Sequence, residues 1–83
     1  MTLRVRLFAR AKDLVGADSI GVEAPPGTTV GELRRRLGSE YPALAGILAH
    51  SLLAVNEEFA DDTLPLPADA EVALLPPVSG GGP

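Results

Sequence analysis

The first residues of the chain alternate between apolar and charged side chains. Leu3, Val5 and Leu7 are apolar, and Arg4 and Arg6 lie between them. Because successive side chains of a strand point to opposite faces of a sheet, this pattern predicts a strand with one buried face and one wet face. Further patterns predict strands at residues 20–24, 52–55 and 71–75, a turn at 56–58 and a brief edge segment at 63–66.

The clearest helical pattern begins at Thr29. Thr29 and Glu32 have the spacing of a capping box, in which each side chain satisfies a free amide near the helix start. Gly38 is placed where a left-handed residue commonly ends a helix. We expect the arginines at 34–36 to lie on the solvent side, near the end of the helix that favours positive charge. A basic binding patch is the alternative interpretation of these arginines. The apolar residues with helical spacing are Val30, Leu33 and Leu37.

Two shorter helical segments and the order of the strands complete the expected fold. Residues 8–15 and 43–50 lose the strand alternation and suit short helices. The first two strands are close enough in sequence to pair antiparallel, and the last strand is expected beside the first. The sequence therefore predicts one α+β domain at residues 1–75, a mixed sheet packed on one main helix. A flexible C-terminal tail is expected at residues 76–83.

Charge divides the chain into two halves. All seven basic residues precede Leu37, together with four acidic residues, whereas the remainder holds seven acidic residues and no Lys or Arg. An acidic surface repels the phosphates of nucleic acids and attracts basic proteins, so we expect no nucleic-acid partner. Solubility is the simpler interpretation of the same charge.

The sequence also bears on the compartment. No apolar run approaches the ~20 residues of a membrane span, and the first residues alternate instead of forming the apolar stretch of a secretory signal. There is no cysteine, which fits a reducing compartment and removes disulfides and thiolate chemistry. We expect a cytoplasmic protein with no membrane partner.

The body of the predicted domain offers few groups for catalysis. His50 is the only histidine and precedes Ser51, but adjacent side chains point in different directions, so we expect a surface or capping residue. Glu57-Glu58 and Asp61-Asp62 flank Phe59 in a predicted loop, without the ligand spacing of a calcium loop. We interpret these acids as a solvated loop or an acidic partner-facing edge. The chain itself is expected to bind no metal and no cofactor.

The C-terminal end has the properties of a substrate. Pro76 and Pro77 restrict the backbone and project the chain away from the last strand. Gly80 and Gly81 have no side chains, so they can thread a channel that is too narrow for other residues. A terminal glycine also offers the least hindered carboxylate. The pattern indicates that the reacting group is the tail rather than a side chain of the domain.

Several segments of the sequence match a known family. They are residues 5–16, 26–30, 32–33, 54–57 and 71–81. On these segments the chain resembles the small subunit of molybdopterin synthase, a ubiquitin-like sulfur carrier. The opening strand and the Pro-Pro-Val-Ser-Gly-Gly end are the most specific parts. The resemblance implies a β-grasp fold, which agrees with the element order given above.

The resemblance also implies a chemistry for the tail. In the family an adenylating and sulfurating enzyme activates the terminal glycine with ATP and magnesium, and a thiocarboxylate results. Gly81 matches this reactive glycine, and Gly80 matches the residue that threads with it. The tail inserts into the large synthase subunit, within a heterotetramer, and its sulfur goes to cyclic pyranopterin monophosphate in molybdenum cofactor biosynthesis. The chain would thus be a non-catalytic, sulfur-donating subunit without an active site of its own.

Further residues are expected to meet the large subunit. Phe8 and Leu75 match family positions that face it, and packing in the core is the alternative for both. The tail residues expected to contribute to this contact are Pro76, Pro77, Val78 and Ser79.

The last two residues depart from the family, which usually ends at the second glycine. Gly82 and Pro83 follow Gly81 here, so the chain as written cannot be adenylated on Gly81. We expect a peptidase to trim the chain after Gly81. The alternatives are that the two residues are foreign to the gene or that the protein is a paralogue without sulfur chemistry. The alternative functions are a carrier for thiamin thiazole or cysteine synthesis and a β-grasp interaction module.

Overall fold

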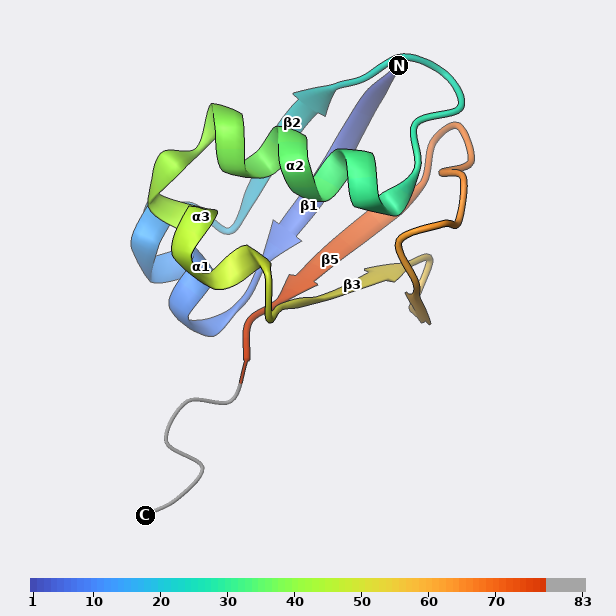
Figure 1. The fold of residues 1–83 in the computed structure, drawn as a ribbon. Coiled ribbons are helices and arrows are strands. Elements are labelled where there is room, and N and C mark those ends of the chain that lie inside the picture. The colour runs from blue at the N-terminus through green and yellow to red at the C-terminus, as the bar shows by residue number, and fades with distance from the viewer. Residues whose placement is uncertain (78–83) are drawn as a thin grey trace.

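Five strands and four helical segments follow one another along residues 1–77, the part of the chain that the computed structural model describes. The strands are β1 (Thr2–Leu7), β2 (Ser19–Glu23), β3 (Leu52–Val55), β4 (Glu58–Ala60) and β5 (Glu71–Leu75). The helical segments are α1 (Ala9–Val15), α2 (Val30–Glu40), the 3₁₀ turn η1 (Pro42–Leu44) and α3 (Ala45–Leu48). The strands form one sheet in the order β2-β1-β5-β3-β4 (Figure 1).

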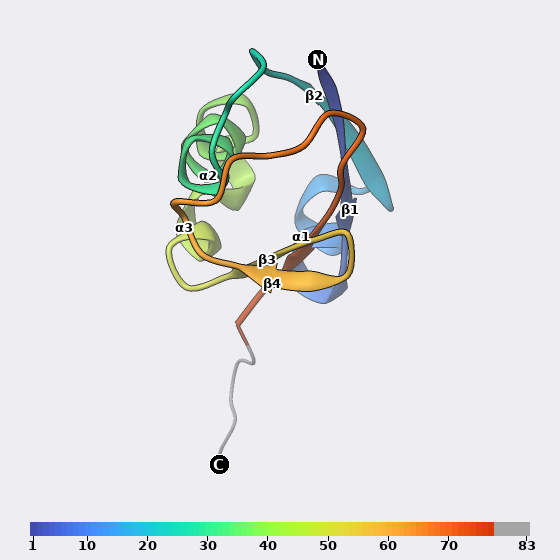
Figure 2. The same cartoon turned by 90° about the vertical axis from the view of Figure 1, so that its right-hand side faces the viewer.

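The sheet is mixed, and its first and last strands pair at its centre. β1 and β5 are parallel, with Val5 opposite Val72, whereas β1 and β2 are antiparallel. β3 pairs antiparallel with both β5 and β4. The sheet curves around α2, as Figure 2 shows. The prediction of an α+β mixed sheet packed on one main helix, with the last strand beside the first, is confirmed.

The core lies between the sheet and α2. The alternation in β1 has the predicted outcome, because Leu3, Val5 and Leu7 are at most 3% exposed while the residues between them are exposed. Burying a leucine or valine side chain stabilises a protein by about 1.5–3 kcal/mol. The α2 residues that face these strands are fully buried and are Val30, Leu33 and Leu37.

The predicted capping box starts α2. The backbone N–H of Glu32 donates to Thr29 Oγ1 at 3.2 Å, and the backbone N–H of Thr29 donates to Glu32 Oε1 at 2.9 Å. The backbone N–H and the hydroxyl of Thr29 both donate to the Glu32 carboxylate, which favours its ionised form and lowers the pKa of Glu32 below its ordinary value. The stability that this contact contributes is therefore lost as the pH falls through the lowered pKa.

The loop after β4 supplies further acceptors to the same end of α2. The N–H of Val30 donates to the carbonyl of Leu64, and the N–H of Gly31 donates to the carbonyl of Asp62, both at 2.9 Å. A Cβ on Gly31 would lie 3.0 Å from Asp62 Cβ, so the glycine permits this approach. Residues 63–66 therefore cross the start of α2, and their prediction as an edge segment of the sheet is wrong.

The predicted end of α2 is also wrong. The helix continues through Gly38 to Glu40, and Tyr41 is its C-cap. A Cβ on Gly38 would lie 3.3 Å from Leu48 Cδ1 of α3. A side chain here would therefore crowd the neighbouring helix, and this packing explains a glycine in the helix interior, where it is otherwise unfavourable.

Arg34 does not lie on the solvent side, contrary to the prediction. Its side chain is only 19% exposed and forms an ion pair with Asp62 at 3.0 Å. It also donates to the carbonyl oxygens of Leu48 and Ser51, so one guanidinium joins α2, the end of α3 and the loop after β4. Because α2 continues to Glu40, no basic residue lies in its last turn.

Within residues 1–77, no helix is long and apolar enough to cross a membrane.

Replacing Arg34 with Met should lower the free energy of unfolding by about 2 kcal/mol, because three acceptors lose a charged donor. Arg35→Met is the matched control, since Arg35 is exposed and forms no ion pair within the described residues. The control should change stability by less than about 0.5 kcal/mol. Urea unfolding of both variants measures the difference, and equal midpoints would contradict the role given to Arg34.

Candidate functional site

One face of the sheet carries no helix among the described residues, and most side chains in the row across it are at least partly exposed. Paired residues of neighbouring strands share a face, so the register identifies the members of this row. It contains Ser19, Arg6, Ala73, Ala54 and Phe59, with Leu52 and Leu75 paired beside it. We call this surface the open face and define it by Arg4, Arg6, Phe8, Ser19, Leu52, Ala54, Phe59, Glu71, Ala73 and Leu75.

The open face carries three large exposed apolar side chains. Phe59 is 72% exposed, Leu52 is 55% exposed and Phe8 is 36% exposed. Leu75 is half-buried beside Leu52, its partner in the register. Exposed apolar groups gathered on one surface are typical of protein interfaces. The open face is therefore the part of the described protein that is best suited to bind another protein.

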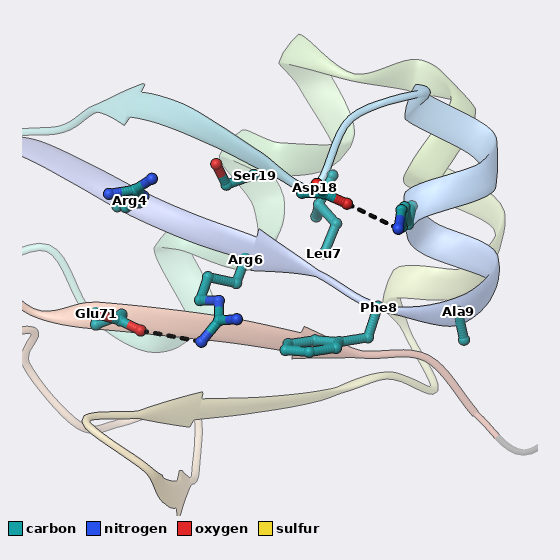
Figure 3. A pocket seen from close by; sticks show the side chains of 9 residues that line it. Arg4, Arg6, Leu7, Phe8, Ala9, Asp18, Ser19 and Glu71 are labelled. Carbon is teal, nitrogen blue, oxygen red and sulfur yellow. Dashed lines mark ion pairs between the residues drawn. The ribbon is translucent and has the colours of Figure 1, made fainter.

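Arg6 orients the Phe8 ring on this face. The Arg6 guanidinium carbon lies 5.4 Å from the centre of the Phe8 ring, within the range of a cation–π contact. The other side of the same guanidinium approaches Glu71 of β5, at 3.5 Å (Figure 3). Ala9 has a positive φ of 50° directly after Phe8, so the chain turns sharply there into α1. The aromatic ring thus stays near β5, where it lines a hollow with Ala73.

A tight hairpin between β3 and β4 presents Phe59. Val55 and Glu58 flank a two-residue turn in which Asn56 and Glu57 have positive φ values of 50° and 72°. Two positive φ values are the pattern of a type I′ turn, which matches the twist of the two strands. The prediction that Phe59 lies in a loop is therefore wrong, because it belongs to β4 and points to the open face.

Asn56 also ties this hairpin to the central strand. Its backbone N–H donates to the carbonyl of Glu71 at 2.8 Å, and its side-chain Oδ1 accepts from the N–H of Glu71 at 3.0 Å. The side chain therefore continues the hydrogen bonding between β3 and β5 past the end of β3. This contact fixes the position of the turn relative to the open face.

The structure brings two of the expected partner-binding residues together. Phe8 and Leu75 both belong to the open face, and neither is part of the buried core. Pro76 is half-buried and Pro77 is exposed where the chain leaves β5. Val78, Ser79, Gly80 and Gly81 lie outside the described residues.

Leu52, Phe59 and Arg6 join this surface without having been singled out from the sequence. The signal that could have identified Phe59 is the Asn56-Glu57 pair, since asparagine favours the left-handed conformation that a tight hairpin needs. Recognising the hairpin would have placed Phe59 opposite Ala54 and therefore on the same face as Ala73.

The other side chains considered for catalysis or metal binding are His50, Ser51 and the acidic residues. Ser51 is buried, and its hydroxyl donates to the carbonyl of Ile47 at 2.6 Å, whereas the neighbouring His50 is exposed. The two residues therefore do not act as a catalytic pair. Among residues 1–77, no group of three or more His, Cys, Asp or Glu side chains is arranged to hold a metal ion.

The mixed sheet around α2 defines a ubiquitin-like protein of the β-grasp class. The chain belongs to the ThiS family, whose sequence model matches residues 5–81. It is 40% identical over 81 residues to a molybdopterin synthase sulfur carrier subunit from Dictyostelium discoideum, and the aligned region covers 94% of each chain.

Solved structures of similar chains share this fold. The crystal structure of SAMP1 from Haloferax volcanii has a TM-score of 0.82 and 31% identity, covering 98% of this chain and 100% of that one. A chain from the complex of subunits 1 and 2 of molybdopterin-converting factor from Helicobacter pylori has a TM-score of 0.69 and 29% identity. Its coverage is again 98% of this chain and 100% of that one. The β-grasp fold predicted from the sequence is confirmed.

Replacing Glu57 with Gly should raise the free energy of unfolding by about 1 kcal/mol, because glycine adopts a positive φ without a steric cost. Glu57→Gln keeps a side chain at the same φ of 72° and serves as the control, with little change expected. Thermal unfolding of the two variants at one pH separates the backbone effect from the loss of charge. An increase of equal size in the glutamine variant would assign the gain to charge instead.

Proposed function

We propose that this protein is the sulfur carrier subunit of a molybdopterin synthase. The observation that carries the proposal is the similarity, over nearly the whole chain, to proteins named as such subunits, at 40% identity in two cases. The open face adds support, because a carrier must dock on the proteins that load and unload it.

The proposed chemistry belongs to the C-terminal glycine. A carboxylate is a poor electrophile, so an adenylating partner uses ATP with magnesium to convert the Gly81 carboxylate into an acyl-adenylate. Sulfur then replaces AMP, and the product is a thiocarboxylate. The carrier donates this sulfur to cyclic pyranopterin monophosphate. Gly80 and Gly81 suit this role because they add no side-chain bulk at the reacting end.

The proposed partner of the open face is the large subunit of the synthase, in a heterotetramer. The similar chain from Helicobacter pylori comes from a complex of subunits 1 and 2 of its converting factor, which supports this kind of partner. Leu75 ends β5 within the open face, and Pro76 and Pro77 follow directly. A protein that docks on Phe8, Leu75 and Phe59 would therefore receive the tail beside its contact surface. The adenylating enzyme needs the same tail, so we propose that it uses the same face in turn.

A peptidase that removes Gly82 and Pro83 is part of the proposal. The family match covers residues 5–81 and so stops at the glycine that would react. Cleavage between Gly81 and Gly82 avoids the hindered tertiary amide before Pro83.

Membership of the ThiS family does not by itself select one pathway. The alternative function to test is a sulfur carrier for thiamin thiazole or cysteine synthesis. The names of the similar curated proteins favour the synthase. A pull-down with the carrier ending at Gly81 discriminates, since the proposal expects the large synthase subunit and the alternative expects a thiazole synthase. An interaction module without sulfur chemistry would keep its activity after residues 80–83 are deleted.

Replacing Phe59 with Asp should weaken binding of the large subunit by at least about tenfold, because a charge would replace the most exposed aromatic group of an apolar contact. Leu14→Asp is the matched control, since Leu14 on α1 is 37% exposed but is not part of the open face. Titration calorimetry measures both affinities, and thermal unfolding confirms that both variants are folded. Equal affinities would place the interface elsewhere.

A protein that ends at Gly81 should gain the mass expected for replacing one oxygen with sulfur when it is incubated with adenylating enzyme, ATP, magnesium and a sulfur donor. A protein that ends at Pro83 should remain unchanged, because its free carboxylate belongs to a hindered imino acid. Intact mass spectrometry reads both results. Sulfur on the intact, Pro83-containing protein would refute the need for trimming.

A further inference from the structure

The chain contains very few groups that an activated carboxyl group can acylate. Lys12 is the only lysine, the other six basic residues are arginines, and there is no cysteine. The guanidinium of arginine stays protonated and is not a nucleophile at neutral pH. Lys12 is thus the one side chain on which a stable amide can form with an activated C-terminus.

This composition matters for the proposed function, on which the inference rests. An acyl-adenylate or a thioester of Gly81 is attacked by a free amine: a C–N bond forms, the C–O or C–S bond breaks, and AMP or thiol leaves. The ammonium group loses its proton to solvent before the attack. The product is an isopeptide, which removes both the reactive terminus and the sulfur from the cycle.

Lys12 lies near the strand that leads into the tail. It lies on α1, which contacts β5, the strand from which the tail departs. It also lines a hollow with Arg6 and Phe8, next to the open face. Six residues from Pro76 to Gly81 span at most ~20 Å when extended. Reaction within one molecule is favoured by a high effective concentration.

The amine of Lys12 is held by Asp18. Lys12 Nζ lies 2.8 Å from Asp18 Oδ1, and the ion pair is drawn at Asp18 in Figure 3. The lysine side chain is 55% exposed, so burial does not protect it. A lysine amine is already largely protonated at neutral pH, and the ion pair favours that protonated form further.

The backbone fixes both members of this pair. Gly16 has a φ of 81° at the end of α1, and its N–H donates to the carbonyl of Lys12 at 2.7 Å. The chain then reverses, and the carbonyl of Asp18 accepts from the N–H of Leu7 at 2.8 Å. The left-handed turn at Gly16 therefore brings Asp18 back beside Lys12. The backbone produces this arrangement without help from the two side chains.

We propose that Asp18 protects Lys12 from acylation by the activated C-terminus of this same carrier. The ion pair keeps the amine protonated and occupied during the interval in which the terminus is reactive. Lys12 is thereby defined as the site of self-modification that the fold suppresses.

The charges around the amine act in the same direction. Asp18 raises the pKa of Lys12 above its ordinary value, first through the hydrogen bond and then through its charge, and Asp13 on α1 adds a smaller effect. The pKa of Asp18 is lowered in turn, mainly by Lys12 itself and to a smaller extent by Arg6 on β1, which keeps Asp18 ionised. Because the pKa of Lys12 is raised in the folded protein, its free amine forms only at a higher pH than the free amine of an unpaired lysine.

The experiment uses the chain ending at Gly81, prepared chemically as a C-terminal thioester, so that no adenylating enzyme is required. Proteolytic mapping with mass spectrometry then measures the rate of Gly81–Lys12 amide formation between pH 7 and pH 10. In Asp18→Ala the rate at neutral pH should increase on the order of two- to fivefold, and the pH profile should shift to lower pH. Asp18→Asn, which keeps the shape of the side chain, should also react faster if the alanine variant is unstable.

Two controls identify the product and the cause. Lys12→Arg should give no amide at residue 12. Asp13→Asn removes a charge next to Lys12 without removing the ion pair, and it should have a smaller effect than Asp18→Asn. Equal rates and equal pH profiles in the parent and both Asp18 variants would overturn the proposal. If the adenylating enzyme does not modify this carrier, the proposed function is contradicted, but the rates of Gly81–Lys12 amide formation are unaffected.

Discussion

The parallel pairing of β1 and β5 is the interaction on which the rest of the structure depends. It joins the first and last strands at the centre of the sheet, with Arg4 opposite Glu71 and Leu7 opposite Leu74. Such a pairing requires the intervening chain to cross from one strand to the other, and α2 with its neighbouring helices makes this crossing over one face. Within residues 1–77 the other face has no helical cover, and the chain leaves β5 at the end of this face. The geometry of the candidate site therefore follows from this single pairing.

The two faces of the sheet have different roles: one forms the core and the other is exposed. The helical side is closed by apolar packing and by Arg34, which satisfies carbonyl oxygens and a carboxylate that three separate segments bring together. The open side keeps aromatic and aliphatic groups at the surface, which is unfavourable for an isolated domain but useful for docking. Three of the four non-glycine residues with positive φ among residues 1–77 lie at its margins, at Ala9 and in the turn of the β3–β4 hairpin. Local backbone strain is commonly found where a surface must be presented in one fixed geometry.

Local patterns in the sequence were sufficient for most of the fold. The alternation in β1 and the capping box of α2 depend on neighbouring residues only, and both are observed as predicted. The errors concern contacts that bring distant segments together. Gly38 resembles a helix end until α3 is packed against it, and Arg34 looks like its exposed neighbours until Asp62 lies beside it. The open face could be predicted only in part, because Phe59 joins it through the register of a hairpin rather than through its place in the sequence.

The parallel arrangement of β1 and β5 has a consequence for anything attached to this domain. Met1 precedes one end of the sheet, while Pro76 departs from the opposite end (Figure 1). A label, an affinity tag or another folded module joined ahead of Met1 is thus carried on the far side from the outgoing tail. The domain can be tethered, immobilised or fused through its amino end while its carboxyl end keeps free access to other proteins.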